Sequence, residues 1–307
     1  MIPRYLNPRN DIAFKKIFGT EKNKDILKHF LNDVIVTHDK KVIKEVTLLN
    51  PMQHPEIIHS KQSTVDVLCE DEDGIQYIVE MQVAKVGGFE KRAQYYAAKA
   101  YSSQPQEGDS YKELKEVVFL AITEYIMFPN KEDYKSVHIT LDQKTYERDL
   151  KDFSFTFIEL PKFKEKEIKN LKTYEQKWCY FFKHADDPDD VAELLKNSDE
   201  VIQKAYRELE AHNWTKEELK QYEANEKRAR DAKARESYIK EEAREKALVE
   251  GRAEGRAEGR AEGRAEGEQK KALSIAKKLL EKGMDPGFVS VTTDLSLAEV
   301  DALLKNK

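Results

Sequence analysis

The chain of 307 residues is poor in cysteine, in long apolar runs and in excess charge of one sign. Its two cysteines, Cys69 and Cys179, lie far apart in apolar surroundings, so we expect buried, reduced thiols rather than a disulfide framework. No apolar stretch approaches the roughly 20 residues that a membrane-spanning helix needs, and the N-terminus has no signal-peptide core. We therefore expect a cytoplasmic protein without a membrane partner.

The charge composition excludes a uniformly basic nucleic-acid binder, because the formal net charge is -5. DNA stays compatible with this composition, since a binding surface can be basic locally and a metal site needs carboxylates. The seven histidines are scattered without metal-ligand spacing, and the nearest pair, His54 and His59, flanks a proline-containing loop. We therefore do not expect a histidine metal site.

Apolar periodicity predicts one α/β domain over residues 1–170 and a helical extension packed on it over residues 171–213. Strands are expected at 42–49, 64–70, 75–82, 117–123, 137–141 and 153–160, and helices near 12–19, 26–34 and 89–102. Consecutive strands followed by a helix and another strand indicate a mixed sheet flanked by helices.

The composition changes over residues 214–271, where opposite charges nearly balance and leucine and isoleucine almost vanish. A Gly-Arg-Ala-Glu repeat runs from Gly251 to Glu266, and on an α-helix each of its stripes advances by about 40° per repeat. Every i,i+4 charge pair in the repeat is like-signed, and each glycine costs about 1 kcal/mol relative to alanine. The repeat is therefore a weak helix alone. It is either a semi-flexible spacer or a self-associating helix that matches arginine and glutamate stripes.

Residues 272–307 regain apolar periodicity and predict a small segment of three helices. Ser296 and Glu299 have the spacing of a capping box at the start of the last helix. The shape is compatible with a helix-turn-helix, but the last helix offers only Lys305 and Lys307 as basic groups. Homo-oligomerisation through this tail is therefore kept beside DNA contact as an interpretation.

The residues that indicate chemistry lie in 63–82, where two β-favouring runs are joined by an acidic turn. With a three-residue loop and Gly74 in the left-handed conformation, Asp66 lies directly opposite Glu80, their Cβ atoms about 5 Å apart. Gln82 shares that face because side chains alternate with period two. A two- or four-residue loop would put the two acids on opposite faces. The other face is expected in the core and carries Val65, Val67, Cys69, Tyr77, Val79 and Met81.

Two carboxylates this close within apolar runs are costly unless a positive group lies between them. Mg²⁺ or another hard divalent cation is the natural candidate, because it takes oxygen ligands and can activate water beside a phosphate. The alternative is an ordinary hairpin whose acids face solvent. That alternative suits the turn residues 70–73 better than Asp66 and Glu80, which lie inside the apolar runs.

Four motifs then point to a family. They are Asn10-Asp-Ile-Ala-Phe-Lys-Lys-Ile-Phe-Gly19, Val65-Asp66, Glu80-Met-Gln82 and Phe89-Glu-Lys-Arg92-Ala-Gln-Tyr-Tyr96. Over roughly residues 5–160 the chain resembles the Rpn recombination-promoting nucleases, also described as PD-(D/E)XK nuclease-family transposases. The resemblance implies a restriction-endonuclease-like sheet in α-β-β-β-α-β order. It also implies Mg²⁺-dependent hydrolysis of DNA and a link to recombination or mobile elements.

The resemblance further implies that Asp66 and Glu80 are metal ligands, with the Met81 carbonyl as a third. Gln82 stands where the motif has lysine, a substitution shared with the family, and it can orient water but supplies no charge. Arg92 on the following helix is our candidate for the missing charge; the alternative is a surface arginine.

Nearby positions keep two interpretations each. Asp11 is either an upstream metal ligand or, as we favour, part of the cap of the first helix. Lys15 and Lys16 either touch phosphate or are solvated. Tyr95 and Tyr96 fit the core better than base stacking.

The leading hypothesis is a DNA endonuclease of low sequence specificity, since no element with base-reading side chains can be identified. The alternative is a catalytically weak or inactive nuclease-fold protein that binds DNA or a partner and assembles through its helical tail. The neutral Gln82 favours this alternative. In a third interpretation the charged helix is the functional part.

Overall fold

The structure, a computed structural model, describes residues 3–35, 41–53, 63–105, 110–185, 194, 196 and 198–305. His54 and His59 lie outside these residues. The chain divides into two compact units, Met1–Asp231 and Ala232–Lys307. Cys69 and Cys179 are both buried, as predicted. Within the described ranges, no helix combines the length and the apolar character that crossing a membrane requires.

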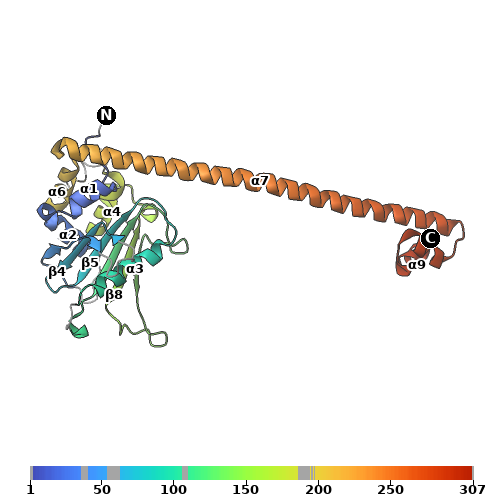
Figure 1. Ribbon diagram of the computed structural model, residues 1–307, viewed down its shortest axis with the longest axis horizontal. Coiled ribbons are helices and arrows are strands. Elements are labelled where there is room, and N and C mark those ends of the chain that lie inside the picture. Colours follow the sequence, from blue (N-terminus) through green and yellow to red (C-terminus); the bar gives the residue numbers. More distant parts are fainter. Residues whose placement is uncertain are drawn as a thin grey trace. The chain divides into compact units, whose positions relative to one another are not determined.

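The first unit is built on a six-stranded mixed sheet, shown in Figure 1, with the strand order β1-β4-β5-β6-β8-β7. Its strands are β1 (Val46–Leu48), β4 (Val67–Asp71), β5 (Gln76–Gln82), β6 (Val117–Thr123), β7 (Lys135–Ile139) and β8 (Phe153–Glu159). Strands β5, β6 and β8 run parallel, and β1, β4 and β7 pair antiparallel. The predicted mixed sheet is confirmed. The small sheet of β2 (Met52–Gln53) and β3 (Ser63–Thr64) was not predicted, because two-residue strands give no periodic signal.

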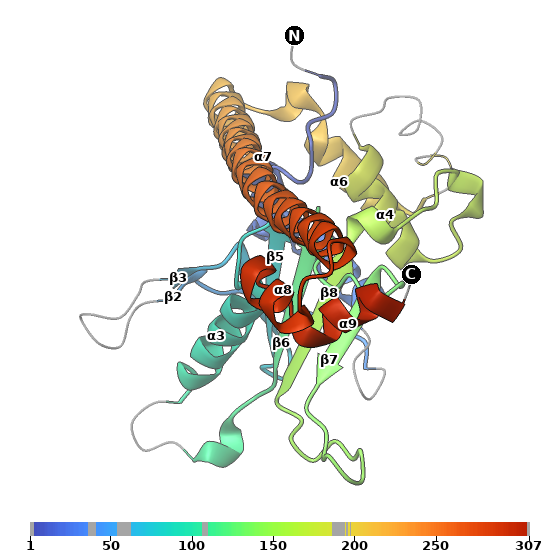
Figure 2. The same ribbon diagram turned by 90° about the vertical axis from the view of Figure 1, so that its right-hand side faces the viewer.

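Helices cover both faces of the sheet (Figure 2). One face packs against α1 (Asp11–Phe18), α2 (Lys24–Val34), α4 (Tyr174–His184) and α6 (Glu200–Leu209). Neighbouring aromatic rings in this core lie 4.9 to 6.2 Å apart between centroids and come from Phe14, Phe18, Phe30, Trp178 and Phe182. The other face packs against α3 (Phe89–Ser102), whose buried Ala93, Ala97 and Ala100 allow a close approach to the sheet.

The β4–β5 hairpin has the predicted register, with Val67 opposite Val79 as its last pair. At the turn, the Asp71 N–H donates to the Ile75 carbonyl at 3.0 Å, and Gly74 has φ +81°. Glycine adopts this left-handed conformation without a Cβ penalty, which is why the three-residue loop forms here. The loop geometry on which the site prediction depends is therefore confirmed.

Asp71 corrects the expectation that the turn acids are solvated. Its carboxylate is buried and accepts hydrogen bonds from the N–H groups of Asp73 (2.9 Å) and Ile75 (3.0 Å) and from the Tyr77 hydroxyl (2.9 Å). A buried carboxylate with three donors is a structural part of the turn. Glu72 and Asp73 are exposed, as expected.

The alternation of faces holds along the paired strands and fails at their open end. Val67, Cys69, Tyr77, Val79 and Met81 face α1 and α2 as predicted, whereas Val65 packs in the core on the α3 side. The prediction for Val65 was wrong because β4 begins only at Val67. The Val65 N–H bonds the Pro51 carbonyl at 3.1 Å, and the chain bends at Asp66, which interrupts the alternation.

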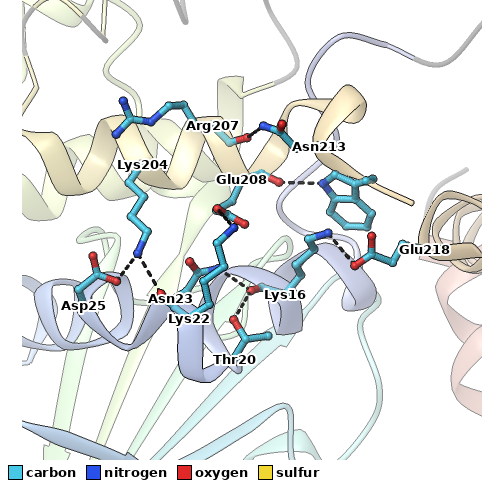
Figure 3. A network of polar contacts seen from close by, with 11 residues as sticks. Lys16, Thr20, Lys22, Asn23, Asp25, Lys204, Arg207, Glu208, Asn213 and Glu218 are labelled. Carbon is cyan, nitrogen blue, oxygen red and sulfur yellow. Dashed lines mark hydrogen bonds and ion pairs between the residues drawn. The ribbon is translucent and has the colours of Figure 1, made fainter. Parts of the chain in front are cut away.

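The N-terminal helices are held from outside by α6 and by the segment that follows it. Figure 3 shows Lys16 directed to Glu218 and Lys22 to Glu208, each at 2.7 Å. Lys204 of α6 reaches Asp25 at 2.7 Å in the same network. The Lys16–Glu218 contact binds α1 to the start of α7 (Lys216–Glu281), and the other two bind the chain around the start of α2 to α6.

Helix α7 includes the charged region and the first helix predicted for the tail, so the expected boundary at residue 271 lies inside it. A Cβ added at Gly251, Gly255, Gly259, Gly263 or Gly267 would meet no atom of the described residues within 4 Å. The repeat is therefore fully exposed along the helix.

In the second unit, α8 (Pro286–Thr293) and α9 (Leu297–Lys305) pack on the last turns of α7. Ala276, Leu280, Val289, Leu295 and Val300 form their core. The predicted capping box is confirmed: the Ser296 N–H donates to Glu299 at 2.8 Å, and the Glu299 N–H donates to the Ser296 hydroxyl at 3.3 Å.

Candidate active site

The candidate site lies at the open end of the β4–β5 hairpin, beyond its last strand pair. The backbone N–H of Asp66 donates to Glu80 Oε1 at 3.2 Å, and the Met81 N–H donates to Asp66 Oδ2 at 2.9 Å. Glu80 is only 3% exposed, and the Asp66 side chain is 15% exposed. The hairpin thus brings the two predicted acids together. The Asp66 carboxylate accepts the Met81 N–H, which would bond a backbone carbonyl if β4 began earlier.

Burial is the main influence on the ionisation of both carboxyl groups. Desolvation raises the pKa of Asp66, and the neighbouring Asp11 charge adds to this, while the Met81 N–H and the Lys15 ammonium oppose it. Desolvation also raises the pKa of Glu80, followed by the negative charge of Asp66. Two adjacent buried acids with raised pKa values are both ionised at neutral pH only where positive charge offsets their desolvation and mutual repulsion.

Gln82 connects Glu80 to the helix on the α3 side. Its Nε2 donates to Glu80 Oε2 at 2.8 Å, and its Oε1 accepts a hydrogen bond from Arg92 Nη2 at 2.6 Å. The Arg92 guanidinium lies over the Phe89 ring at 4.8 Å and near the Tyr96 ring at 5.9 Å. Arg92 is therefore oriented toward the site by its own helix, and its charge lowers the pKa of Glu80.

On the opposite side, α1 brings two charged residues to Asp66. Lys15 Nζ lies 2.6 Å from Asp11 Oδ1 and 3.3 Å from Asp66 Oδ1. The helix cap is made by Asn10, whose Oδ1 accepts the Ile12 N–H at 3.0 Å. Asp11 is the first residue of α1 and lies beside Lys15 and Asp66 instead of capping.

Three other candidates are placed outside the hairpin. Lys16 Nζ pairs with Glu218 at 2.7 Å and lies 4.3 Å from the centre of the Trp214 ring, so it is neither solvated nor turned to Asp66. Tyr96 is half-buried against the α3-side core, whereas Tyr95 is 45% exposed, which corrects its assignment to the core.

The comparison with protein families agrees with this geometry. A family described as PD-(D/E)XK nuclease family transposase matches residues 8–240. The chain belongs to this family. A second match, described as Rpn/YhgA-like nuclease family, C-terminal HTH domain, covers residues 269–305. Neither a curated protein nor a solved structure is detectably similar to the chain.

Membership in the PD-(D/E)XK family confirms the predicted fold and supports a nuclease type of function. The six-stranded mixed sheet with helices on both faces is the PD-(D/E)XK architecture, and the last turns of α7 together with α8 and α9 form the segment matched as a helix-turn-helix domain. The site residues of the hairpin remain predictions, since a family match does not test individual side chains.

The donors at the hairpin fit a hard divalent cation. Asp66 and Glu80 offer buried carboxylate oxygens, and the Met81 carbonyl points to the same strand edge as its N–H, which bonds Asp66. Such ions take oxygen ligands and complete their coordination with water. Among the described residues, no group of three or more histidine, cysteine, aspartate or glutamate side chains is arranged for a metal ion. The fit therefore rests on two carboxylates and one carbonyl.

Sequence reasoning did not distinguish Lys15 from Lys16, although one contacts the site and the other contacts α7. Neighbouring residues on an α-helix point about 100° apart, so Lys15 and Lys16 are expected to have different surroundings. Which of the two contacts the site depends on the face of α1 that packs on the hairpin, and the sequence pattern does not give that face.

Proposed function

We propose that the protein is a metal-dependent DNA endonuclease of low sequence specificity, with a role in recombination or mobile elements. The observation that carries the proposal is the buried, adjacent pair Asp66 and Glu80, with the cationic Lys15 and Arg92 on either side. This arrangement is suited to a reaction that develops negative charge on a phosphate.

Asp66, Glu80 and the Met81 carbonyl would hold Mg²⁺ or another hard divalent cation. Bound there, the ion would lower the pKa of a coordinated water and neutralise charge on the phosphate. Gln82 can orient a water through the amide group that already bonds Glu80. Arg92 fixes the Gln82 amide and adds positive charge on the α3 side.

Low specificity is supported by the kind of groups around the carboxylates. The Lys15 ammonium and the Arg92 guanidinium suit phosphate oxygens, and contacts to phosphates carry no base information. DNA is therefore the proposed partner, engaged through its backbone. Homo-oligomerisation through the tail remains a second proposal about partners.

The test is Mg²⁺-dependent nicking of a supercoiled plasmid by the full chain. Asp66→Asn and Glu80→Gln should each lower the nicking rate by about 10³-fold, because each removes a charged ligand from the proposed ion. Asp73→Asn is the matched control: it changes a carboxylate of the same hairpin at its exposed tip, and it should nick like wild type. Thermal melting establishes that each variant is folded.

A second candidate is a binding protein that does not cut DNA, and the neutral Gln82 in place of lysine favours it. Under this alternative, wild type and variants would bind a duplex in Ca²⁺ equally well and none would nick it in Mg²⁺. Nicking by wild type and by Asp73→Asn, lost in both site variants, would exclude it.

A further inference from the structure

Lys15 is the cation closest to the candidate ligands on the α1 side. Its ammonium lies between the carboxylates of Asp11 and Asp66, at 2.6 and 3.3 Å. Its side chain is 38% exposed, so a large substrate can reach it. Asp66 has a second anchor, the Met81 N–H on its other oxygen. The geometry of Asp66 therefore does not depend on Lys15 alone.

The next residue has a different role. Lys16 pairs with Glu218, lies over the Trp214 ring and is 19% exposed at its side chain. Figure 3 shows it directed toward Glu218 at the start of α7. Two consecutive lysines thus share one helix but have separate surroundings: one belongs to the site, and the other to the packing of α7.

The site needs a movable positive charge that Gln82 and Arg92 do not provide. Gln82 is neutral, and Arg92 is bonded to Gln82 Oε1 and stacked on Phe89. Lys15 is instead paired with Asp66, a proposed ligand of a cation. When Asp66 is occupied by that cation, Lys15 keeps only Asp11 as a partner, and its flexible ammonium can also bind a phosphate oxygen.

We propose that Lys15 supplies the phosphate-binding charge that the lysine of the general PD-(D/E)XK motif would provide at the position of Gln82. The inference rests on the proposed nuclease function. In the ion-free protein Lys15 is the countercharge of Asp11 and Asp66, and in the loaded protein it contacts the DNA backbone. Lys15 therefore contributes by placing a positive charge at the phosphate of the substrate, and not by holding Asp66 in position.

The first measurement is the single-turnover nicking rate at saturating Mg²⁺ for Lys15→Met, Lys15→Arg and the matched Lys16→Met. Lys15→Met should lose about 100-fold, which is the usual effect of removing one group that stabilises transition-state charge. Lys15→Arg should recover at least about tenfold of this loss, because it restores the charge. Lys16→Met should stay within about threefold of wild type and melt at a lower temperature.

The second measurement separates charge from support by following Mn²⁺ binding through the electron spin resonance of the free ion. Lys15→Met should bind Mn²⁺ as tightly as wild type or more tightly, because a competing cation has been removed from Asp66. Binding weakened more than about tenfold would overturn the proposal, since Lys15 would then act by holding Asp66.

The third measurement does not depend on cleavage: the affinity for a short duplex at several salt concentrations, in Ca²⁺ and in EDTA. In Ca²⁺, Lys15→Met should reduce the slope of log affinity against log salt by about 0.9, the effect of one lost phosphate contact. In EDTA the slopes of wild type and Lys15→Met should agree, because Lys15 is then paired with the carboxylates of both Asp11 and Asp66. Equal slopes in Ca²⁺ would overturn the inference on Lys15 even if wild type nicks DNA. If wild type does not nick but the Ca²⁺ slopes differ, the nuclease proposal fails alone.

Discussion

Two regions of the molecule use charged residues in opposite ways. At the hairpin, Glu80 is 3% exposed, and each of its carboxylate oxygens has a named hydrogen-bond partner. At the end of the Gly-Arg-Ala-Glu repeat of α7, Arg264 pairs with Glu268 just beyond it, and their side chains are 82% and 68% exposed. The hairpin has few charged groups, which are buried in a low-dielectric interior, whereas this part of α7 has many charged groups in contact with water.

The difference shows that burial of a charged group has more influence on its pKa and on its interaction energy than the number of charged groups nearby. Exposed pairs contribute about 0 to 1 kcal/mol, because water and salt screen them. Buried acids shift their own pKa values and those of their neighbours, as Asp66 does for Glu80. A sequence rich in charge therefore indicates chemistry only where apolar residues surround the acids.

Truncation can show how much of α7 the first unit, which contains the hairpin, needs for its stability. A chain ending at Thr215 should lose about 3–5 kcal/mol of unfolding free energy, because it loses the buried Tyr222. It also loses the bond from Asn10 Nδ2 to Glu226 Oε1, 2.9 Å long, beside the residue that starts α1. Nicking should fall with stability, since α1 carries Asp11 and Lys15. Urea unfolding and plasmid nicking measure the two effects.

The matched control ends at Asp231 and keeps Glu218, Tyr222 and Glu226. It should retain the stability and nicking rate of the first unit, because these residues bond Lys16 of α1 and Asn7 and Asn10 just before it. Equal stability and equal nicking rates of the two truncations would contradict this, because residues 216–231 would then not stabilise the first unit.

The pH dependence of stability tests the buried charges directly. A carboxyl group whose pKa is raised by folding binds more protons in the folded state, so stability is highest at low pH and falls as pH rises toward the raised pKa. In EDTA, the melting temperature of wild type should therefore fall between about pH 5 and pH 8. Both Asp66 and Glu80 contribute to this fall.

Glu80→Gln should flatten the fall in EDTA, because it removes one of the two buried charges. Mg²⁺ should flatten it in wild type by stabilising the ionised carboxylates, and Asp73→Asn should leave it unchanged. A wild-type profile that rises with pH in EDTA would contradict the burial of the pair.

The smallest effect is expected in the exposed repeat. Gly255→Ala and Gly259→Ala should each stabilise α7 locally by about 1 kcal/mol, since an added Cβ meets no described atom within 4 Å. Circular dichroism and hydrogen exchange measure the gain in helix, and nicking should be unchanged. A loss of self-association in sedimentation would instead show that these glycines allow close contact between two copies, which would decide between the spacer and the assembly interpretations.

Sequence patterns were sufficient where local chemistry fixes the geometry. Gly74 and the acidic turn suited a three-residue loop, which the structure confirms, and the loop length fixes which residues of β4 and β5 face each other. The full length of α3 and of β6 also followed from apolar spacing. These elements could be predicted because each depends on interactions between residues close in the chain.

The errors share one cause, which is packing between distant segments. Val65 and Tyr95 were assigned to the wrong surroundings, Asp71 was expected in solvent, and Asp11 was expected to cap α1. In each case the outcome depends on which segment covers the residue, such as α3 over Val65. Periodicity gives the face of an element but not what lies against that face.

By itself, the sequence determined the family, the order of the elements and the register of the β4–β5 hairpin, because motifs, apolar spacing and turn residues act over short distances. The tertiary structure alone decided that Lys15 meets Asp66 while Lys16 meets Glu218. It also decided that Arg92 reaches Gln82 from α3. Such contacts join side chains of different elements, and they arise only when the helices pack against the sheet and against each other.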